Sequence, residues 1–326
     1  MDNDVREWFR RRTYRTAQFD VEQLVDIKHA TGDRISVVLP ALNEERTVGE
    51  IVQRIRDCLV KGVPLVDELV VIDSGSQDRT AARARAAGAT VVSADELLSA
   101  YGRRPGKGDA LWKSLSATTG DIVAYVDADL IDFDPSFVVG LVGPLLTNPA
   151  VGYVKGLYDR PLQTVEGIAP EGGGRVTELI ARPLLNAIWP ELAGFVQPLS
   201  GEYAGRRRLL EAVPFASGYG VEIALLIDLL ALAGLDALAQ TDLGVRRHRN
   251  QQDPALGRMA GEILQTALRR APGATSRSAM LTQFLRVEEG HEYVDWDVAT
   301  VDRPPMRTLP EYARRRYHLL PRTVGD

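Results

Sequence analysis

Four Asp-x-Asp pairs occur in the sequence, and they begin at Asp2, Asp127, Asp132 and Asp295. Two carboxylates at positions i and i+2 can both reach one cation where a strand unwinds into a loop, and their hard oxygen atoms suit Mg²⁺ or Mn²⁺. The same spacing also suits a helix cap or a solvated surface. The elements around each pair must therefore decide which pair, if any, carries chemistry.

Three further residues have side chains suited to metal or phosphate chemistry. Lys107 lies between two glycines at a predicted helix start, where it either meets a phosphate or points from a turn into solvent. His248 is flanked by arginines that favour its neutral imidazole, so it is either a third ligand for Mn²⁺ or part of a basic strand end. Glu222 lies just inside an apolar helix, where it is either a functional carboxylate with a partner or a helix-start residue favoured by the dipole.

The glycine-rich segment "EGGGRVTEL" at residues 171–179 is a candidate anion site. Its glycines free backbone N–H groups to converge just before a helix start, and Arg175 and Thr177 add a charged fork and a hydroxyl. The segment lacks the Gly-Lys-Ser/Thr ending of a P-loop. Local sequence slightly favours the alternative, a flexible loop in which Thr177 caps the helix.

The elements that would position these residues alternate regularly from Asp33 onward. We expect strands at 34–40, 67–73, 89–94 and 121–130, and helices at 48–59, 79–88 and 106–120. This alternation predicts an α/β fold with right-handed βαβ units and a mainly parallel, Rossmann-like sheet covered by helices on both faces. Ligands of such sheets bind outside the carboxyl ends of the strands.

That rule separates the four carboxylate pairs. The ends of the first, second and fourth expected strands bring polar side chains to one edge of the sheet, namely Asn43, Glu44, Asp73, Asp127 and Asp129. The pair at Asp132 and Asp134 precedes Pro135, which predicts helix entry and capping instead. The pairs at Asp2 and Asp295 follow no buried strand, so we expect solvated carboxylates there.

The alternation weakens after Asp134, where we expect a mixed α/β region. Its most apolar stretch begins at Val221, but acidic residues and Gly234 interrupt it, which favours a buried helix over a membrane span. From about Pro272 onward, proline, arginine and small polar residues predict a tail or an arm rather than a domain.

Composition narrows the class of protein. The chain has 326 residues, of which 45% are hydrophobic and 25% charged, and its net charge of −5 predicts a globular protein without general affinity for nucleic acid or anionic membranes. Its single cysteine, Cys58, excludes an internal disulfide and is expected to be a small buried hydrophobe on a helix. One cysteine and a charged N-terminus without an apolar signal region predict a cytoplasmic location.

Two sets of motifs resemble known enzymes. The first set resembles the nucleotide-sugar half of a GT-A glycosyltransferase and consists of "SVVLPALNEE", "VVIDSGSQDRT", "PGKGDALWKS" and "YVDADL". The second set resembles the actinobacterial glucosyl-3-phosphoglycerate synthases and consists of "GGGRVTELIARPLL", "QPLSGEYAGRR", "GYGVEIALLID", "GVRRHRN" and "VDRPPM". The similarity runs from about Ile35 to Asn250.

The resemblance implies roles for individual residues. Those implied to bind the UDP-glucose donor are Pro40, Ala41, Leu42, Asn43, Glu44, Asp73, Ser74, Lys107, Asp127 and Ala128. Those implied to bind the 3-phosphoglycerate acceptor are Gly174, Arg175, Val176, Thr177 and Asn250. Asp129 and His248 are implied to hold Mg²⁺ or Mn²⁺, while Asp127 and Glu222 are implied to be catalytic, with Glu222 beside the transferred glucose.

The resemblance also implies an overall organisation. It implies a homodimer that transfers glucose to the 2-hydroxyl of the acceptor with retention of configuration. We expect four parts of the chain: an N-terminal helical arm (1–32), a nucleotide-sugar-binding subdomain (33–131), an acceptor-binding subdomain (132–271) and a C-terminal arm or tail (272–326). We expect front-face attack, in which a diphosphate oxygen of the donor takes the proton.

Other classes of protein share some of these features. A mannosyl-3-phosphoglycerate synthase that uses GDP-mannose would differ by few contacts. A polyprenyl-phosphate glycosyltransferase shares the N-terminal half but usually needs a membrane anchor, which the sequence does not show. A nucleotide-sugar sensor without turnover needs neither a metal pair nor an acceptor loop. A nucleotidyltransferase normally has a glycine-rich, arginine-containing loop where this chain has "PALNEE".

Overall fold

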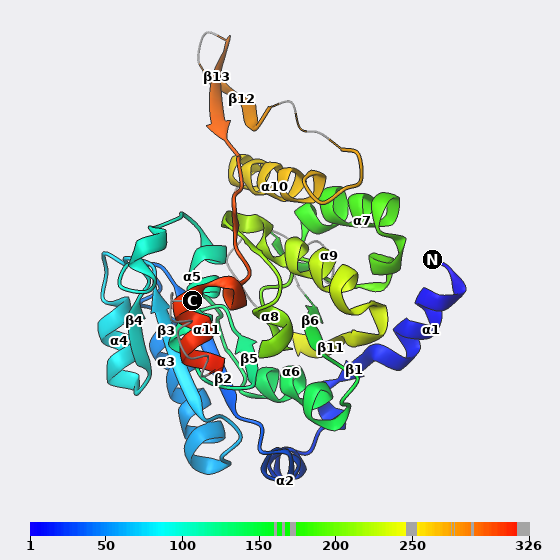
Figure 1. Ribbon diagram of the computed structural model, residues 1–326. Helices are drawn as coiled ribbons and strands as arrows, with labels where there is room; N and C mark the ends of the chain where they lie inside the picture. The colour runs from blue at the N-terminus through cyan, green and yellow to red at the C-terminus, as the bar shows by residue number, and fades with distance from the viewer. Residues whose placement is uncertain are drawn as a thin grey trace, which may run out of the picture.

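The computed structural model describes residues 1–159, 162–164, 167–169, 174–245, 253–274, 276, 278–287 and 290–317. Its centre is an eight-stranded sheet in the order β1-β11-β6-β9-β5-β2-β3-β4 (Figure 1). The strands of this sheet are β1 (Thr13–Arg15), β2 (Ile35–Ala41), β3 (Glu68–Asp73), β4 (Thr90–Ser93), β5 (Ile122–Tyr125), β6 (Tyr153–Asp159), β9 (Tyr203–Arg206) and β11 (Leu238–Val245). Strand β9 is antiparallel to both of its neighbours, and the other pairings in the sheet are parallel.

The predicted α/β fold with a mainly parallel sheet is confirmed. The strands expected at 34–40, 67–73 and 89–94 are β2, β3 and β4, each within one residue at either end. The fourth is shorter than expected, because β5 ends at Tyr125 and leaves Asp127 and Asp129 in the loop that follows. Strand β2 pairs with both β3 and β5, so the carboxyl ends of these three strands lie side by side.

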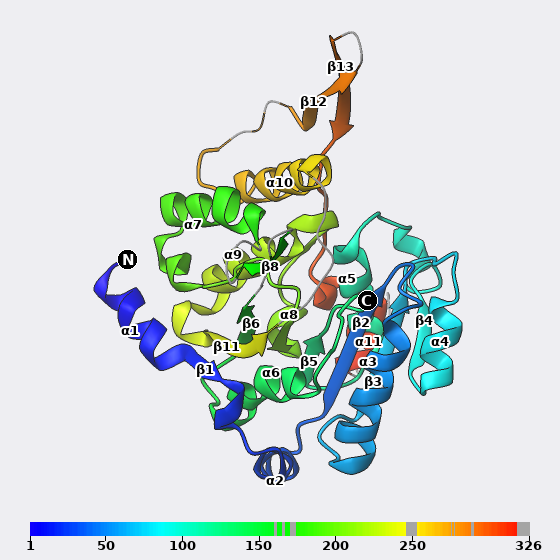
Figure 2. The same ribbon diagram turned by 180° about the vertical axis from the view of Figure 1, so that it is seen from behind.

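Helices cover both faces of the sheet, as the two opposite views show (Figures 1 and 2). They are α1 (Asn3–Arg12), α2 (Val21–Thr31), α3 (Val48–Ile55), α4 (Thr80–Ala87), α5 (Lys107–Ala117), α6 (Ser136–Thr147), α7 (Arg182–Ile188), α8 (Arg207–Leu210), α9 (Val221–Ala233), α10 (Asp253–Leu268) and α11 (Pro310–Tyr317). Asp134 accepts a hydrogen bond from the backbone N–H of Ser136 at 2.7 Å, which confirms its predicted place at the entry of α6.

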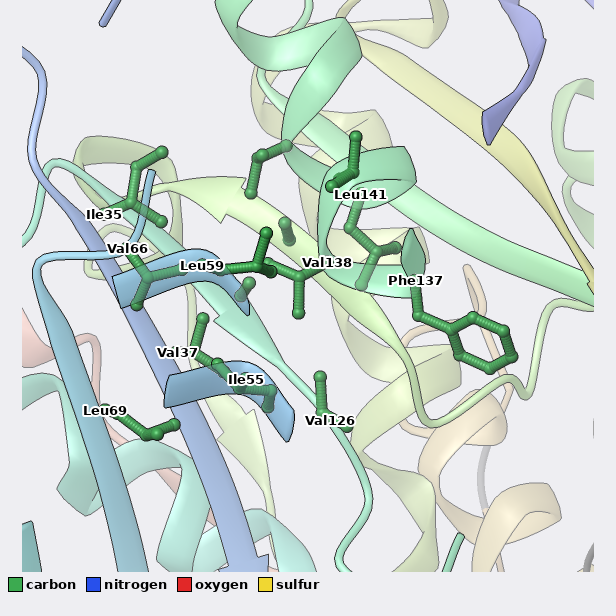
Figure 3. Close-up of a cluster of buried hydrophobic side chains, with 14 of the residues drawn as sticks. Ile35, Val37, Ile55, Leu59, Val66, Leu69, Val126, Phe137, Val138 and Leu141 are labelled. Atoms are coloured by element: carbon green, nitrogen blue, oxygen red, sulfur yellow. The ribbon is translucent and has the colours of Figure 1, made fainter. Parts of the chain in front are cut away.

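One face of the sheet packs against α2, α3 and α6 (Figure 3). The apolar residues that recur at helical spacing in α3 and its continuation are all buried, from Val48 to Leu59. They meet Val138 and Leu141 of α6 and the β-branched side chains of β2, so a single apolar layer holds β2 in place. This layer fixes the strand whose end opens into the candidate site.

Cys58 does not lie in that layer, and the prediction that it is buried was wrong. Helix α3 continues into a π-helical turn over Arg56–Gly62, which has more residues per turn than an α-helix. The wider turn keeps Leu59 in the core, at 4% exposure, and places Cys58 at the surface.

The other face of the sheet packs against α5 and α9, with α1, α7, α8, α10 and α11 around them. The predicted buried helix that begins at Val221 is confirmed as α9, in which most side chains as far as Leu229 are buried. Within the described residues, no helix combines the length and the apolar character needed to cross a membrane.

The C-terminal part begins as a projecting hairpin and then returns to the body of the molecule. Strands β12 (Met280–Val287) and β13 (Gly290–Asp297) form the hairpin, which extends beyond α10 in both views (Figures 1 and 2). The chain then pairs β14 (Asp302–Arg303) with β10 (Phe215–Ala216) and buries Met306, Leu309 and Tyr312. Two short strands, β7 (Leu162–Thr164) and β8 (Gly167–Ala169), pair with each other in antiparallel fashion.

Candidate active site

A cavity of about 600 Å³ lies at the carboxyl ends of β2, β3 and β5. Its wall brings together most of the residues predicted for the site, namely Pro40, Ala41, Leu42, Glu44, Ser74, Lys107, Asp127, Ala128, Asp129, Gly174, Arg175, Val176, Thr177 and Glu222. These residues come from segments that are far apart in the sequence. The strand-end rule therefore located the cavity correctly.

Two predicted residues, Asn43 and Asp73, hold the loops at the cavity edge and are not among the wall residues. Asn43 has a positive φ of 59°, and its side-chain oxygen accepts a hydrogen bond from the backbone N–H of Gln77 at 2.8 Å. Asp73 accepts one from the backbone N–H of Ser76 at 3.3 Å. The predicted residues His248 and Asn250 lie outside the described residues.

Lys107 is the charged centre of the cavity. Its ammonium donates a short hydrogen bond to Asp127 and lies 3.1 Å from Oε1 of Glu222. Burial alone would lower the pKa of Lys107, but the charges of Asp127 and Glu222 outweigh it and hold the pKa well above its ordinary value. Lys107 is therefore a fixed positive charge shared by two carboxylates, and the alternative of a lysine in an exposed turn is ruled out.

The backbone at Gly201 lies so close to Asp127 that it restricts the position of the carboxylate. A Cβ atom on Gly201 would lie 2.1 Å from Oδ2 of Asp127, closer than any real contact. The start of α5 is equally tight, because a Cβ on Gly106, whose φ is 94°, would lie 2.5 Å from Cα of Gly218. These glycines let the loops that carry Asp127, Lys107 and Glu222 converge on one point.

The Asp127–Asp129 pair suits a hard divalent cation by its chemistry. Both carboxylates line the cavity beyond the end of β5, and oxygen ligands are those that Mg²⁺ and Mn²⁺ prefer. Among the described residues, no group of three potential metal ligands comes together. The predicted third ligand, His248, follows β11 outside those residues, so the metal site with Asp129 and His248 stays a prediction.

Glu222 is both a helix-start residue and a buried partner of a cation. It lies in the first turn of α9, is 7% exposed and pairs with Lys107. The helix-start position and the charged partner are therefore both present at Glu222, and its catalytic role stays a prediction. A carboxylate fixed at this depth can accept hydrogen bonds from a bound sugar without rearranging.

The described part of the glycine-rich segment, from Gly174 onward, forms a helical turn at the cavity wall. Gly174 has a φ of 90°, and its carbonyl accepts a hydrogen bond from the N–H of Glu178 at 3.0 Å. Helical structure is already present at Arg175, so Thr177 lies inside the turn and is not its cap. Thr177 is 6% exposed, whereas Arg175 is exposed, and both line the cavity.

Several wall residues were not predicted. Arg103 and Arg104 directly precede the "PGKG" motif, and Arg103 donates a hydrogen bond to the carbonyl of Ser74 at 2.8 Å. Tyr219 is 46% exposed, and its N–H donates to Glu262 of α10 at 2.8 Å. Helix α10 adds an apolar wall of Leu256, Met259 and Ile263. The adjacent arginines were a signal in the sequence, but no local pattern ties α10 to the strand ends.

A buried ion pair from the C-terminal return supports the cavity wall at the start of α5. Nε of Arg303 donates to Asp109 in the first turn of α5 at 2.6 Å. Its two other nitrogens donate to the carbonyls of Tyr101 and Gly102 at 2.7 and 2.8 Å. Because residues 103–106 also line the cavity, Arg303 fixes the loop that carries them.

Comparisons with known proteins agree with this geometry. The model of glycosyl transferase family 2 matches residues 36–210. Glucosyl-3-phosphoglycerate synthase of Mycolicibacterium smegmatis is 53% identical over 289 residues, which cover 88% of this chain and 93% of that protein. The crystal structure of glucosyl-3-phosphoglycerate synthase from Mycobacterium tuberculosis in complex with Mn²⁺, UDP and phosphoglyceric acid is similar with a TM-score of 0.80 and 49% identity, over 89% of this chain and 95% of that chain.

A second solved structure is similar over most of its length. The crystal structure of mannosyl-3-phosphoglycerate synthase from Rubrobacter xylanophilus has a TM-score of 0.86 and 42% identity, over 94% of this chain and 98% of that chain. The chain therefore belongs to glycosyl transferase family 2 and, within it, to the glucosyl-3-phosphoglycerate synthase family.

Proposed function

We propose that this protein transfers glucose from UDP-glucose to the 2-hydroxyl of 3-phosphoglycerate, with retention of configuration. The observation that carries the proposal is the meeting of Lys107, Asp127 and Glu222 with the Gly174–Thr177 turn in one cavity. Family membership supports the choice of substrates. The synthase from Mycobacterium tuberculosis was crystallised with Mn²⁺, UDP-glucose and phosphoglyceric acid, and also with UDP and glucosyl-3-phosphoglycerate.

The donor side of the proposed site is formed by the ends of β2 and β3 and the start of α5. We assign the nucleotide to Pro40, Ala41, Leu42, Asn43, Glu44, Asp73, Ser74 and Ala128. Of these, Asn43 and Asp73 would act through the loops that they hold. The ammonium of Lys107, already fixed by carboxylates, supplies the positive charge that a diphosphate needs.

The acceptor side is formed by the turn after the glycine-rich segment. Gly174, Arg175, Val176 and Thr177 line the cavity, and Arg175 offers a fork suited to a carboxylate or a phosphate. Asn250 completes the proposed acceptor set from outside the described residues. The acceptor is a small trianion, so a few fixed cations suffice in a protein whose net charge is −5.

We propose that Asp129 and His248 hold Mg²⁺ or Mn²⁺. When bound, such a cation stabilises negative charge on a departing diphosphate. The acceptor oxygen would form its bond to the anomeric carbon on the face from which the diphosphate leaves, and the hydroxyl proton would pass to a diphosphate oxygen. Glu222 and Asp127 would orient the sugar and the acceptor during this exchange, because both are held by Lys107.

A mannosyl transfer from GDP-mannose is the second candidate. The similarity to the Rubrobacter xylanophilus structure favours it, since the two chains match over almost their whole length. An assay separates glucosyl from mannosyl transfer. It offers UDP-glucose or GDP-mannose as donor and 3-phosphoglycerate or a polyprenyl phosphate as acceptor, with and without Mg²⁺. We expect product from UDP-glucose in the presence of Mg²⁺. Product from GDP-mannose alone would replace the first proposal, and product formation only with a polyprenyl phosphate would overturn both.

We also propose that the protein is a cytoplasmic homodimer whose hairpin β12–β13 contacts the second copy. Phe284 and Tyr293 are opposite each other in the hairpin register and are 70% and 68% exposed, a costly arrangement for a free monomer. The division into parts 1–32, 33–131, 132–271 and 272–326 fits this proposal, because the hairpin belongs to the last part.

The dimer is tested by sedimentation. We expect wild type to sediment as a dimer and Phe284→Glu to sediment as a monomer, because a charge opposite Tyr293 would be buried in the contact. Leu232→Glu is the matched control, since Leu232 is an exposed apolar residue on α9 at 45% exposure. A dimer that survives Phe284→Glu would place the contact elsewhere.

A further inference from the structure

A buried polar cluster lies on the face of the sheet that α9 covers. Lys155 of β6 is directly opposite Tyr203 of β9, and Tyr153 is two residues before Lys155 on the same face. The ammonium of Lys155 lies 4.5 Å from the centre of the Tyr203 ring. Lys155 is 1% exposed and the two tyrosines are fully buried, so this cluster is cut off from solvent.

The polar atoms of this cluster are not satisfied by hydrogen bonds. Within the described residues, neither Nζ of Lys155 nor the hydroxyl of Tyr153 or Tyr203 has a hydrogen-bond partner. A buried ammonium without a carboxylate against it is destabilising, and an apolar side chain of similar size would pack as well. Packing alone therefore does not account for a lysine at this position.

The charges around Lys155 come from several elements. Three carboxylates face it, namely Glu222 from α9, Glu202 beside β9 and Asp127 after β5, and the ammonium of Lys107 opposes them. Burial lowers the pKa of Lys155 to about 7, and the charge of Glu222 works against that shift. The same carboxylate contributes to the raised pKa of Tyr153 and of Tyr203, after burial, so all three groups sense Glu222.

Lys107 is shared between Asp127 and Glu222 before any substrate binds. In the proposed function it binds the donor diphosphate, which draws its charge away from Glu222. Because Glu222 is only 7% exposed, solvent does not stabilise its negative charge once Lys107 interacts with the diphosphate. Arg103, Arg104 and Arg175 also line the cavity but are exposed, whereas Lys155 is a buried cation that interacts electrostatically with Glu222.

We infer that Lys155 is a positioning residue, the buried counter-charge that keeps the Glu222 carboxylate in place when the donor diphosphate engages Lys107. This inference rests on the proposed function for its kinetic consequence, because Glu222 must act on the sugar during transfer. The electrostatic link between Lys155 and Glu222 does not depend on the proposed function.

The kinetic test compares Lys155→Met with Lys155→Arg and wild type. We expect Lys155→Met to lower kcat for glucosyl transfer by about tenfold or more and to change the KM for UDP-glucose by less than about twofold. Lys155→Arg keeps the charge and should recover part of the loss. A methionine variant with wild-type kcat would overturn the inference, and Lys155→Gln provides a second neutral variant for the same comparison.

Lys28→Met is the matched control for burial. Lys28 is also buried, at 5% exposure, but its ammonium pairs with Asp67 at 2.8 Å and donates to the carbonyl of Pro64, on the opposite face of the sheet. Its loss should lower stability and leave kcat unchanged. If Lys155→Met and Lys28→Met lowered kcat to the same extent, a general loss of rigidity would explain the effect of Lys155→Met. That result would contradict the inference.

A double-mutant cycle tests the link without any turnover. Lys155→Met, Glu222→Gln and the double variant are unfolded in urea at about pH 6 and about pH 9. We expect a favourable coupling between the two side chains at the lower pH, which fades at the higher pH as Lys155 loses its proton. Absence of coupling at the lower pH would overturn the inference. Wild type that transfers no glucose but shows the coupling would refute the proposed function alone.

Discussion

At the scale of single residues, the site depends on charges that are fixed before a substrate arrives. Lys107 is held by two carboxylates and lies 3.5 Å from the carbonyl oxygen of Gly201, so its ammonium has a defined position. Fixed charges of this kind need no reorganisation when charge develops in a reaction. Small displacements of Lys107 or its carboxylate partners should therefore change the rate of the reaction.

Gly201→Ala tests that sensitivity. The new Cβ would lie 2.1 Å from Oδ2 of Asp127, so either the carboxylate or the loop must move. We expect a loss of about 100-fold in kcat with an intact fold, since a shift of about 1 Å at a reacting centre has this effect. Circular dichroism tests whether the fold is intact, and initial rates measure kcat.

Gly49→Ala is the control for this substitution. Gly49 lies in α3, and an added Cβ there would meet its nearest neighbours at an ordinary 3.8 Å. Alanine should leave the rate unchanged and slightly stabilise the helix. Equal rates for Gly201→Ala and wild type would show that Asp127 is not closely placed.

The pH dependence of stability gives a second prediction at this scale, and its sign follows from Lys155. Burial lowers the pKa of this group to about 7 from the ordinary 10.5, so the unfolded chain binds more protons between these values. The destabilisation is fully present below the folded pKa and disappears as the pH rises toward the unfolded one. Lys155→Met should therefore raise the free energy of unfolding most at about pH 6 and least at about pH 10. Urea titrations at both values measure the difference, and a gain that does not vary with pH would contradict it.

At the scale of elements, the C-terminal return supports the cavity wall at the start of α5. Arg303 links the first turn of α5 to the carbonyls of Tyr101 and Gly102 while it is itself buried. Because the neighbouring Trp112 also donates its indole N–H to the carbonyl of Pro304 at 2.7 Å, the return and α5 form one packed unit.

Arg303→Met should weaken this unit. Removing Arg303 should lower the free energy of unfolding by about 2 kcal/mol, because two buried carbonyls lose their donor and Asp109 keeps its charge in the core beside Lys113. We expect a higher KM for UDP-glucose as well, since the loop at 103–106 loses its anchor. Arg269→Met is the control: Arg269 pairs with Asp302 at 2.9 Å, but both are 33% exposed, so its loss should be worth about 0.5 kcal/mol or less. Equal effects of the two variants would show that Arg303 has no special role.

Local sequence predicted the strands and the place of the site, and it did so for physical reasons. The β-branched runs and their turn residues define β2, β3 and β4, and the ends of parallel strands must meet at one edge. Local sequence did not predict the burial of Lys155, the wall formed by α10 or the anchor at Arg303. These depend on contacts between residues far apart in the chain, and the turn that exposes Cys58 depends on a local change of helix type.

At the scale of the whole molecule, the cavity is closed by parts that come from both halves of the chain. Residues 40–42, 44 and 127–129 come from the first half of the chain, 174–177, 218, 219 and 222 from the second, and Leu256, Met259 and Ile263 of α10 complete the wall. Helix α10 lies next to the projecting hairpin (Figure 1). Helix α10 also contacts the hairpin, because Arg258 lies over the ring of Trp296 at 4.1 Å. A transferase that must bring two anionic substrates together needs such a composite wall.

The most direct measurement of the central claim is the structure of the product. Purified protein with Mg²⁺, UDP-glucose and 3-phosphoglycerate is analysed by mass spectrometry and by NMR of the anomeric proton. The account predicts UDP and a glucosyl-3-phosphoglycerate, linked through the 2-hydroxyl with the anomeric configuration of the donor. Free glucose without acceptor product, or a product of inverted configuration, would contradict it.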